Sequence, residues 1–333
     1  MRVSPLCLGT FMLGAPWGTP DRDASVATIH AALDGGVTFI DTADVYSAGE
    51  SERIVGRALA GGRRDGVILA TKVQGQVQGS DPNRRGASRR WIAQACEDSL
   101  RRLGTDWIDL YQIHRPDPDA DVDETLGALT DLVRAGKIRA FGGAKRPASQ
   151  IVEAQWTAER RFRERFVTEQ VRYSLLARGP EAEVLPTCRR HDLGVMAWSP
   201  LAGGWLTDRR HADDATFAAP AGPAQLQAVE RLTLLAEEAG IPLVHLALAF
   251  VLQHPAVTTP IIGPRSVAEL ESHLGAVDVA LGAELLDRID AIVAPGTTLA
   301  PLAADFVPPA LADPALRRRS AAAGQAPGVM SGT

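Results

Sequence analysis

The segment GGVTFIDTADVYSAGESERIVGRAL, at residues 35–59, decides the fold because it joins a short apolar run to a helical pattern through a polar loop. The apolar run at 38–41 predicts a buried strand. Apolar residues at helical spacing over 51–60 predict an amphipathic helix. The segment therefore predicts one strand–loop–helix unit, and the same unit recurs on both sides of it.

Seven further apolar and β-branched runs predict the other strands, at 6–9, 67–71, 107–111, 138–141, 166–170, 195–198 and 258–262. Helical patterns lie between them, at 24–34, 89–103, 122–135, 147–160, 181–191 and 225–239. Such alternation implies right-handed crossovers between parallel strands, and eight parallel strands can close on themselves. We therefore predict a single α/β domain, a (β/α)8 TIM-type barrel, over residues 1–311. Residues 294–309 would lie over its mouth, and 312–333 would form a disordered tail.

A doubly wound open sheet uses the same alternation, so the choice between the two folds needs another feature. A dinucleotide-binding sheet would place G-x-G-x-x-G directly after the first strand. The first strand is followed instead by TFMLGAPWGTPDRD, whose glycines lack that spacing. The barrel is favoured, and 333 residues with 45% hydrophobic content suffice for one large core.

Composition excludes several classes of function. A net charge of −5 with scattered basic residues gives no electrostatic footprint for nucleic acid. Cys7, Cys96 and Cys188 are odd in number and far apart, which argues against a disulfide framework and against a zinc site. The N-terminus has no secretory-signal pattern and no long apolar stretch predicts a membrane span. We expect a cytoplasmic protein with neither a nucleic-acid nor a membrane partner.

Four polar residues follow predicted strands and should converge at one end of the barrel: Asp41, Tyr46, Lys72 and His114. They suit carbonyl reduction, in which a proton donor must meet a developing alkoxide. The phenol of tyrosine, with an ordinary pKa near 10, is a poor donor unless its neighbours tune it. A neighbouring lysine would lower the pKa of Tyr46, Asp41 would hold that lysine charged, and His114 could hydrogen-bond to the carbonyl oxygen.

The chain resembles the aldo-keto reductases, in the branch that includes bacterial and potassium-channel β-subunit-like members. The resemblance runs from Arg2 to about Ile292 and rests on RVSPLCLGT, GGVTFIDTADVYSAGESERIVGRAL, SLRRLGTDWIDLYQIHRPDPDADVDETLGALTDLVRAGKIRAFG, EQ followed by YSLLAR, GVMAWSPLAGGWL and TPIIGPRSVAELESHLGA. It implies NAD(P)H-dependent reduction of an aldehyde or ketone, with the four residues above as the catalytic tetrad and Tyr46 as proton donor. A small-molecule carbonyl substrate is implied, while the oligomeric state stays open.

The resemblance also implies where the cofactor binds. Gln170 matches the glutamine that bonds the nicotinamide carboxamide, and Trp198 matches the aromatic residue beneath the nicotinamide ring. The pyrophosphate would lie along Ser199, Leu201 and Gly203. The adenosine end would lie at Gly263, Arg265, Ser266, Glu269 and His273.

Arg265 suits a 2′-phosphate and favours NADPH, whereas the carboxylate of Glu269 would repel that phosphate. The position of Glu269 is often glutamine or arginine in the family, and His273 replaces a usual asparagine. NADH therefore remains possible.

The sequence departs from the family pattern after the fifth strand. Ala144 and Lys145 stand where serine and asparagine or threonine usually bond the nicotinamide carboxamide, and Ala144 cannot form that bond. Lys145, Arg146 and Arg172 add three cations on this side of the expected site. These changes are compatible with drift to a solvated loop, with a cofactor held differently by Lys145, or with an anionic substrate, as in a sugar- or natural-product-tailoring ketoreductase. They are also compatible with a cofactor-impaired barrel that serves as a binding or regulatory subunit.

Overall fold

The computed structural model describes residues 1–15, 18–19, 21–75, 81–207, 221–299, 311 and 313–317. Its eight parallel strands pair in sequence order, and β8 pairs with β1, so the sheet closes into a barrel. The strands are β1 (Cys7–Gly9), β2 (Phe39–Asp41), β3 (Ile68–Val73), β4 (Ile108–Ile113), β5 (Ile138–Ala144), β6 (Thr168–Arg172), β7 (Gly194–Trp198) and β8 (Thr259–Ile262). All eight predicted strands are confirmed, and the single (β/α)8 barrel with them.

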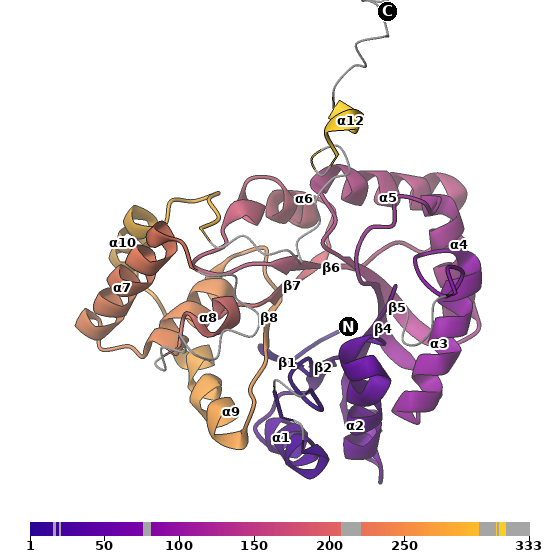
Figure 1. Cartoon of the computed structure of the whole chain (residues 1–333), viewed down its shortest axis with the longest axis horizontal. Coiled ribbons are helices and arrows are strands. Elements are labelled where there is room, and N and C mark those ends of the chain that lie inside the picture. The colour runs from indigo at the N-terminus through magenta and orange to yellow at the C-terminus, as the bar shows by residue number, and fades with distance from the viewer. Residues whose placement is uncertain are drawn as a thin grey trace, which may run out of the picture.

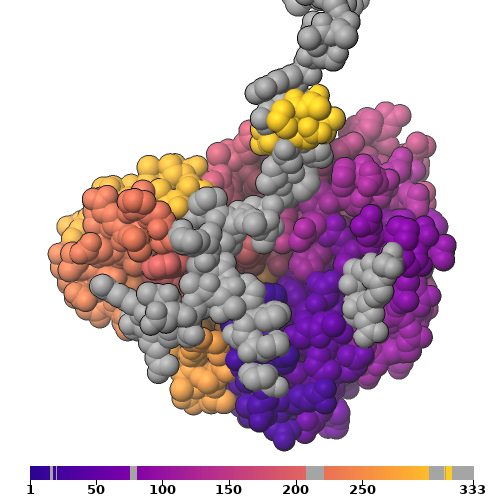
Figure 2. All heavy atoms as spheres, in the orientation of Figure 1, coloured from indigo at the N-terminus to yellow at the C-terminus, as the bar shows by residue number. Residues whose placement is uncertain are grey.

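Helices surround the barrel, as Figure 1 shows. They are α1 (Arg22–Asp34), α2 (Glu50–Leu59), α3 (Arg89–Leu103), α4 (Val122–Arg134), α5 (Ala148–Arg161), α6 (Val184–Arg190), α7 (Pro223–Glu238), α8 (Leu243–Gln253), α9 (Val267–Leu274) and α10 (Ala283–Ile292). The short α12 (Pro314–Arg317) lies apart from this ring. In the space-filling view α7 and α10 lie on one side of the molecule and α3 to α5 on the other (Figure 2). The ring closes where α9 contacts α1.

The helix α8 was missed by the sequence prediction. Its sequence, LVHLALAFVLQ, is apolar almost all round and so shows no helical periodicity. It is buried between its neighbours, which explains the composition. Among the described residues no single helix is long and apolar enough to cross a membrane, although α7 and α8, which meet at a 96° bend, pass that test when taken together.

Two apolar clusters stabilise the barrel. The larger one lies between the strands and the surrounding helices. The smaller one takes one residue from each of six strands, namely Cys7, Phe39, Ala70, Leu110, Met196 and Ile261. Strand neighbours of these residues belong to the larger cluster, and side chains alternate along a strand, so the smaller cluster fills the barrel interior.

The strands β3 to β6 run two or three residues past their predicted ends. Lys72, which we expected just after the third strand, therefore lies within β3 and points into the barrel. At the other end of the chain, Thr298 pairs with Ala177 in the loop after β6, and Arg178 N–H donates to Thr297 O at 2.7 Å. Most of the segment predicted over the mouth, and most of the predicted tail, lie outside the described residues.

Candidate active site

A polar layer lies directly above the apolar cluster inside the barrel. Asp41 stands two residues after Phe39, and Lys72 stands two residues after Ala70, so both point inward one level higher. The layer is completed by Gln112 on β4 and Gln170 on β6, both of which are buried. Because these residues lie toward the carboxyl ends of β2, β3, β4 and β6, the polar groups meet at the carboxyl end of the barrel.

The ammonium of Lys72 is the centre of this layer. Its Nζ donates to Asp41 Oδ2 at 2.6 Å, to Thr42 O at 2.9 Å and to Tyr46 Oη at 3.0 Å. The side chain is 0% exposed, and these three acceptors use all three of its protons. The other oxygen of the carboxylate, Asp41 Oδ1, accepts from Gln112 Nε2 at 2.9 Å and from Gln170 Nε2 at 3.2 Å. The buried ion pair is thus hydrogen-bonded on both sides.

Electrostatics fix the charge state of the pair and of the phenol beside it. Burial is the largest influence on the pKa of Lys72 and lowers it, but Asp41 and Tyr46 together hold that pKa above its ordinary value. Burial raises the pKa of Tyr46, and the nearby ammonium offsets this in part. The charge of Lys72 acts to lower the pKa of the phenol, as the sequence predicted, but burial outweighs it, so the pKa of Tyr46 is raised and not lowered. Near neutral pH the site therefore holds a cationic lysine and a protonated tyrosine.

The phenol reaches the barrel from the loop after β2. Tyr46 begins a 3-10 turn, Tyr46–Gly49, in which Ser47 has a φ of 48° and Ala48 a φ of 54°. Residues other than glycine rarely adopt this left-handed backbone conformation, and backbone strain of this kind clusters at functional sites. The ring packs edge-on against Phe11, with 5.1 Å between ring centroids. Tyr46 is thereby held above Lys72.

The imidazole of His114 lies beside the phenol. His114 follows β4, its N–H donates to Val73 O at 3.0 Å, and its ring centroid is 5.9 Å from that of Tyr46. Burial, and then the positive charges of Lys72, Lys145 and Arg115, hold its pKa well below the ordinary value. The imidazole is therefore neutral at physiological pH, with one ring nitrogen as donor and the other as acceptor. The four residues predicted to converge do lie together.

The rim next to Gln170 is shaped by Trp198 at the end of β7. The indole packs against the interior cluster, and its Nε1 is buried without a hydrogen-bond partner among the described residues. The chain then turns through Ser199, with a φ of 55°, and Gly203, with a φ of 70°. Leu201 lies between them and precedes a short 3-10 turn. Left-handed residues of this kind present backbone N–H groups to anions.

A second group of predicted residues lies where β8 leads into α9. Arg265 follows Gly263, and Ser266 caps α9 by accepting from Glu269 N–H at 3.2 Å. The carboxylate of Glu269 accepts from the N–H of Arg265 at 2.8 Å and from its guanidinium at 2.9 Å. Burial alone would raise the pKa of Glu269, but the bonds from Arg265 hold it below its ordinary value. His273 is buried, and its Nδ1 has no hydrogen-bond partner within the described part of the chain.

Comparison with known proteins decides the family. The model of the aldo/keto reductase family matches residues 5–294, which cover the barrel from β1 to the end of α10. The chain belongs to the aldo/keto reductase family. It is accordingly an oxidoreductase, and members of this family generally use NAD(P)H.

Relatives of different kinds are similar to the chain over most of its length. The oxidoreductase YrpG of Bacillus subtilis, described as uncharacterized, is 41% identical over 88% of this chain and 93% of its own. The aldo-keto reductase YhdN of the same bacterium is 36% identical, covering 82% and 84%. A probable voltage-gated potassium channel subunit beta of Oryza sativa subsp. japonica is 33% identical, covering 88% and 94%.

The three cations after β5 and β6 do not form one group, which corrects the sequence interpretation. Arg146 is buried against Glu169, which accepts from its backbone N–H and its Nε, both at 2.9 Å. Its guanidinium also lies over the ring of Phe166, 3.7 Å from the centroid. Arg146 is therefore part of the packing between α5 and the barrel and not part of a solvated loop. Lys145 turns the other way, and its Nζ lies 5.1 Å from the ring centroid of Trp198.

Sequence reasoning missed three buried polar residues around the tetrad. Gln112 stands at the inward position between Leu110 and His114, so the alternation along the fourth strand carried a signal that could have identified it. Asp44 and Glu52 lie behind the tetrad and are fully buried. Neither carried such a signal, because both fall in a loop and helix whose burial depends on the assembled barrel.

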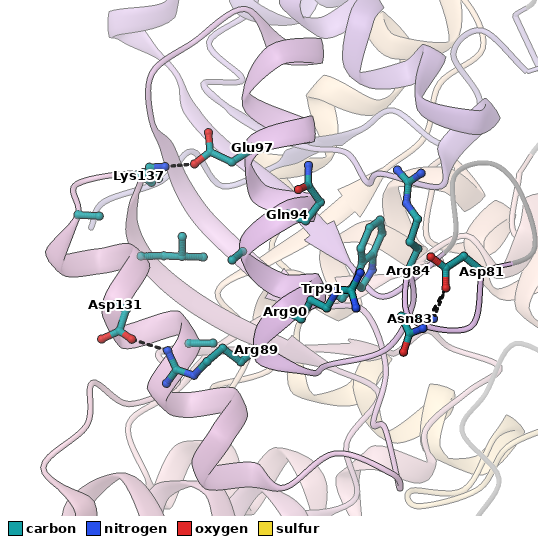
Figure 3. A pocket seen from close by; sticks show the side chains of 14 residues that line it. Asp81, Asn83, Arg84, Arg89, Arg90, Trp91, Gln94, Glu97, Asp131 and Lys137 are labelled. Carbon is teal, nitrogen blue, oxygen red and sulfur yellow. Dashed lines mark hydrogen bonds and ion pairs between the residues drawn. The ribbon is translucent and has the colours of Figure 1, made fainter.

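A large surface groove lies away from the tetrad, on the outside of the barrel between α3 and α4 (Figure 3). Its volume is about 690 Å³, and charged side chains line it. Lys137 forms an ion pair with Glu97, and Arg89 pairs with Asp131 at 2.5 Å. In each of these two exposed ion pairs the opposite charges neutralise each other. The groove offers no catalytic arrangement comparable to the tetrad.

Proposed function

We propose that the protein reduces an aldehyde or ketone to an alcohol with NAD(P)H, and that Tyr46 is the proton donor. The observation that supports this most directly is the position of Lys72 Nζ, which is fully buried and donates to Asp41 and Tyr46 at once. A buried ammonium aimed at a phenol stabilises the phenolate that remains after proton transfer.

The residues at the rim fit a nicotinamide cofactor. Trp198 offers a ring at the mouth and an Nε1 that is buried without a hydrogen-bond partner among the described residues, and Gln170 brings an amide into the polar layer. Ser199 and Gly203 supply backbone suited to a pyrophosphate. When bound there, a reduced nicotinamide supplies the hydride that the carbonyl carbon accepts.

The side chains of the tetrad complete the reaction. The neutral imidazole of His114 donates a hydrogen bond to the carbonyl oxygen and polarises it. Tyr46 Oη donates its proton to that oxygen as the alkoxide develops, because an alcohol is a weaker acid than a phenol. Lys72 then stabilises the phenolate, and Asp41 keeps the ammonium in place. Reprotonation of Tyr46 from solvent restores the starting state.

We propose NADPH as the preferred cofactor, with NADH accepted. Arg265 stands before α9, where a cation and a helix N-terminus both favour phosphate. The pairing with Glu269 supports tolerance of NADH, since a 2′-phosphate must compete with a carboxylate that already engages the guanidinium. The ratio of kcat/KM for NADPH to that for NADH measures this preference.

Two measurements test the proposed function. Titration with NADPH should quench tryptophan fluorescence saturably, and a panel of aldehydes and ketones should oxidise NADPH in the presence of protein. Tyr46→Phe should retain cofactor binding and lose most of the turnover, because the ring remains while the proton is lost. Cofactor binding without turnover of any carbonyl compound, or full activity in Tyr46→Phe, would contradict the proposal. The alternative from the sequence, a cofactor-impaired barrel that serves as a binding or regulatory subunit, would give no saturable quenching by NADPH.

A further inference from the structure

Lys145 is fixed at the rim of the barrel by its backbone. It follows β5 directly, and Ala144 pairs with Gln170 in the neighbouring strand. The N–H of Lys145 donates to Gln170 O at 3.0 Å, and its φ of 63° is left-handed. Alternation along β5 would turn Lys145 away from the barrel interior, because Ala144 faces inward. The kink instead directs Lys145 toward Trp198 and Arg146 toward Glu169. The direction in which the side chain of Lys145 leaves the backbone therefore follows from the ladder between β5 and β6.

The ammonium of Lys145 lies near both halves of the reaction site. Its Nζ is 5.1 Å from the ring centroid of Trp198, which we propose as the platform for the nicotinamide. It also acts on His114, whose pKa its charge helps to lower. An ammonium that lies near Trp198 and acts on His114 faces the space that a substrate occupies when His114 binds its carbonyl oxygen.

A second cation borders the same space. Arg172 is the register partner of Trp198 in the ladder between β6 and β7. Side chains alternate along β6, so Arg172 lies on the same face as Gln170, one level closer to the mouth. In the layer below, the charges of Asp41 and Lys72 cancel. The side chains of Lys145 and Arg172 thus both lie at the rim formed by the ends of β5 and β6, above the Asp41–Lys72 ion pair.

We propose that Lys145 is a specificity-determining residue that selects carbonyl substrates bearing a carboxylate. The inference rests on the proposed function, since it names the class of compound that the same site reduces. The carboxylate accepts a charge-assisted hydrogen bond from Lys145 Nζ while His114 and Tyr46 hold the carbonyl oxygen. Aldehydes and ketones that also carry an acid group are therefore the preferred substrates.

A pair of aldehydes that differ in one charge tests the inference. 4-Carboxybenzaldehyde carries a carboxylate, and methyl 4-formylbenzoate has the same ring and aldehyde without the charge. The wild type should show a kcat/KM about tenfold or more higher for the acid, as expected for a charge-assisted hydrogen bond. Lys145→Met should lose that preference and keep the kcat/KM for the ester within about twofold. Lys145→Arg should retain much of the preference, and Lys137→Met, in the outer groove, should behave as wild type.

Equilibrium binding separates the substrate role from a cofactor role. Terephthalate should bind the NADP⁺-loaded wild type about tenfold more tightly than the loaded Lys145→Met variant, as measured by calorimetry. The NADPH affinity of the two proteins should agree. Weaker NADPH binding in Lys145→Met, with equal losses for acid and ester, would overturn the inference and assign Lys145 to the cofactor. Equal terephthalate affinity in the two proteins would also overturn it. If the wild type binds NADPH yet reduces neither aldehyde nor any compound of the wider panel, the proposed function itself fails, and the inference with it.

Discussion

Asp44 is a buried acid whose ionisation should set how the stability of this barrel depends on pH. It lies in the loop between β2 and Tyr46, and its N–H donates to Lys72 O at 3.2 Å. Burial, and then the neighbouring Glu52, raise its pKa from 3.8 to about 8. Backbone N–H groups of Gln74 and Val45 temper the rise, but neither carboxyl oxygen forms a hydrogen bond with the described residues. At pH 7 the folded protein therefore holds Asp44 protonated.

The pKa of Asp44 differs between the folded protein and the unfolded chain, and this difference sets the sign and size of its effect on stability. The unfolded chain releases the proton of Asp44 near pH 4, while the folded chain keeps it until about pH 8. Between these two pH values the folded state binds more protons than the unfolded chain. The contribution of Asp44 to the free energy of unfolding therefore falls as pH rises through this range, and it stays constant above about pH 8. A pKa raised from 3.8 to about 8 corresponds to at most about 6 kcal/mol, at about 1.4 kcal/mol per pH unit. Water entering around an ionised group reduces this, and we expect about 2–4 kcal/mol.

Asp44→Asn tests the prediction, because the amide keeps the shape and cannot ionise. Urea unfolding of both proteins between pH 4 and pH 9 should give similar stabilities near pH 4 and a growing advantage for the variant up to about pH 8. Parallel pH profiles would refute the reasoning, as would an Asp44→Asn protein less stable than the wild type at pH 8. Either result would show that the carboxyl is ionised and solvated in the folded protein.

Three further substitutions probe the polar layer, the cofactor preference and the outer packing. Gln112→Leu removes the 2.9 Å bond to Asp41, and should lower both kcat/KM and the free energy of unfolding, the latter by about 2 kcal/mol in urea; unchanged kcat/KM would contradict a positioning role. Glu269→Gln releases Arg265 and should raise the NADPH-to-NADH ratio of kcat/KM about tenfold, whereas a constant ratio would show that the ion pair does not restrain cofactor choice. Glu169→Gln leaves a buried guanidinium without its counter-charge and should cost about 3–5 kcal/mol of stability, so an unchanged urea midpoint would argue against burial of that pair.

The strands and the convergence of the tetrad could be predicted because both depend on local patterns. Short apolar runs ending in a polar residue identify a strand and its carboxyl end at once, and parallel strands bring those ends together. Asp41 and His114 follow this rule directly. Lys72 does so with a shift of position, since β3 continues past it. The polar layer is thus encoded strand by strand.

Helix α8 and the partners of the buried acids could not be predicted in the same way. An all-apolar helix gives no periodic signal, and its burial depends on neighbours from both sides of the chain. The burial of Glu52, on α2, depends on two donors from other elements. Thr71 on β3 and Arg102 on α3 each donate to its carboxylate at 2.6 Å. Contacts between distant segments of this kind appear in no single stretch of sequence.

Lys145 and Arg146 show most clearly what a sequence leaves open. Two adjacent cations look like one positive patch, but a left-handed backbone at Lys145 sends one ammonium to the mouth and turns the next guanidinium into the packing. The conformation is held by the bond from Lys145 N–H to Gln170 O and by Glu169, which accepts from Arg146 N–H. Adjacent residues of β6 thus set the directions of adjacent residues after β5. A change at Glu169 should therefore lower stability and also alter the direction of the Lys145 side chain. The packing outside the barrel is in this way coupled to the selection of substrate at its mouth.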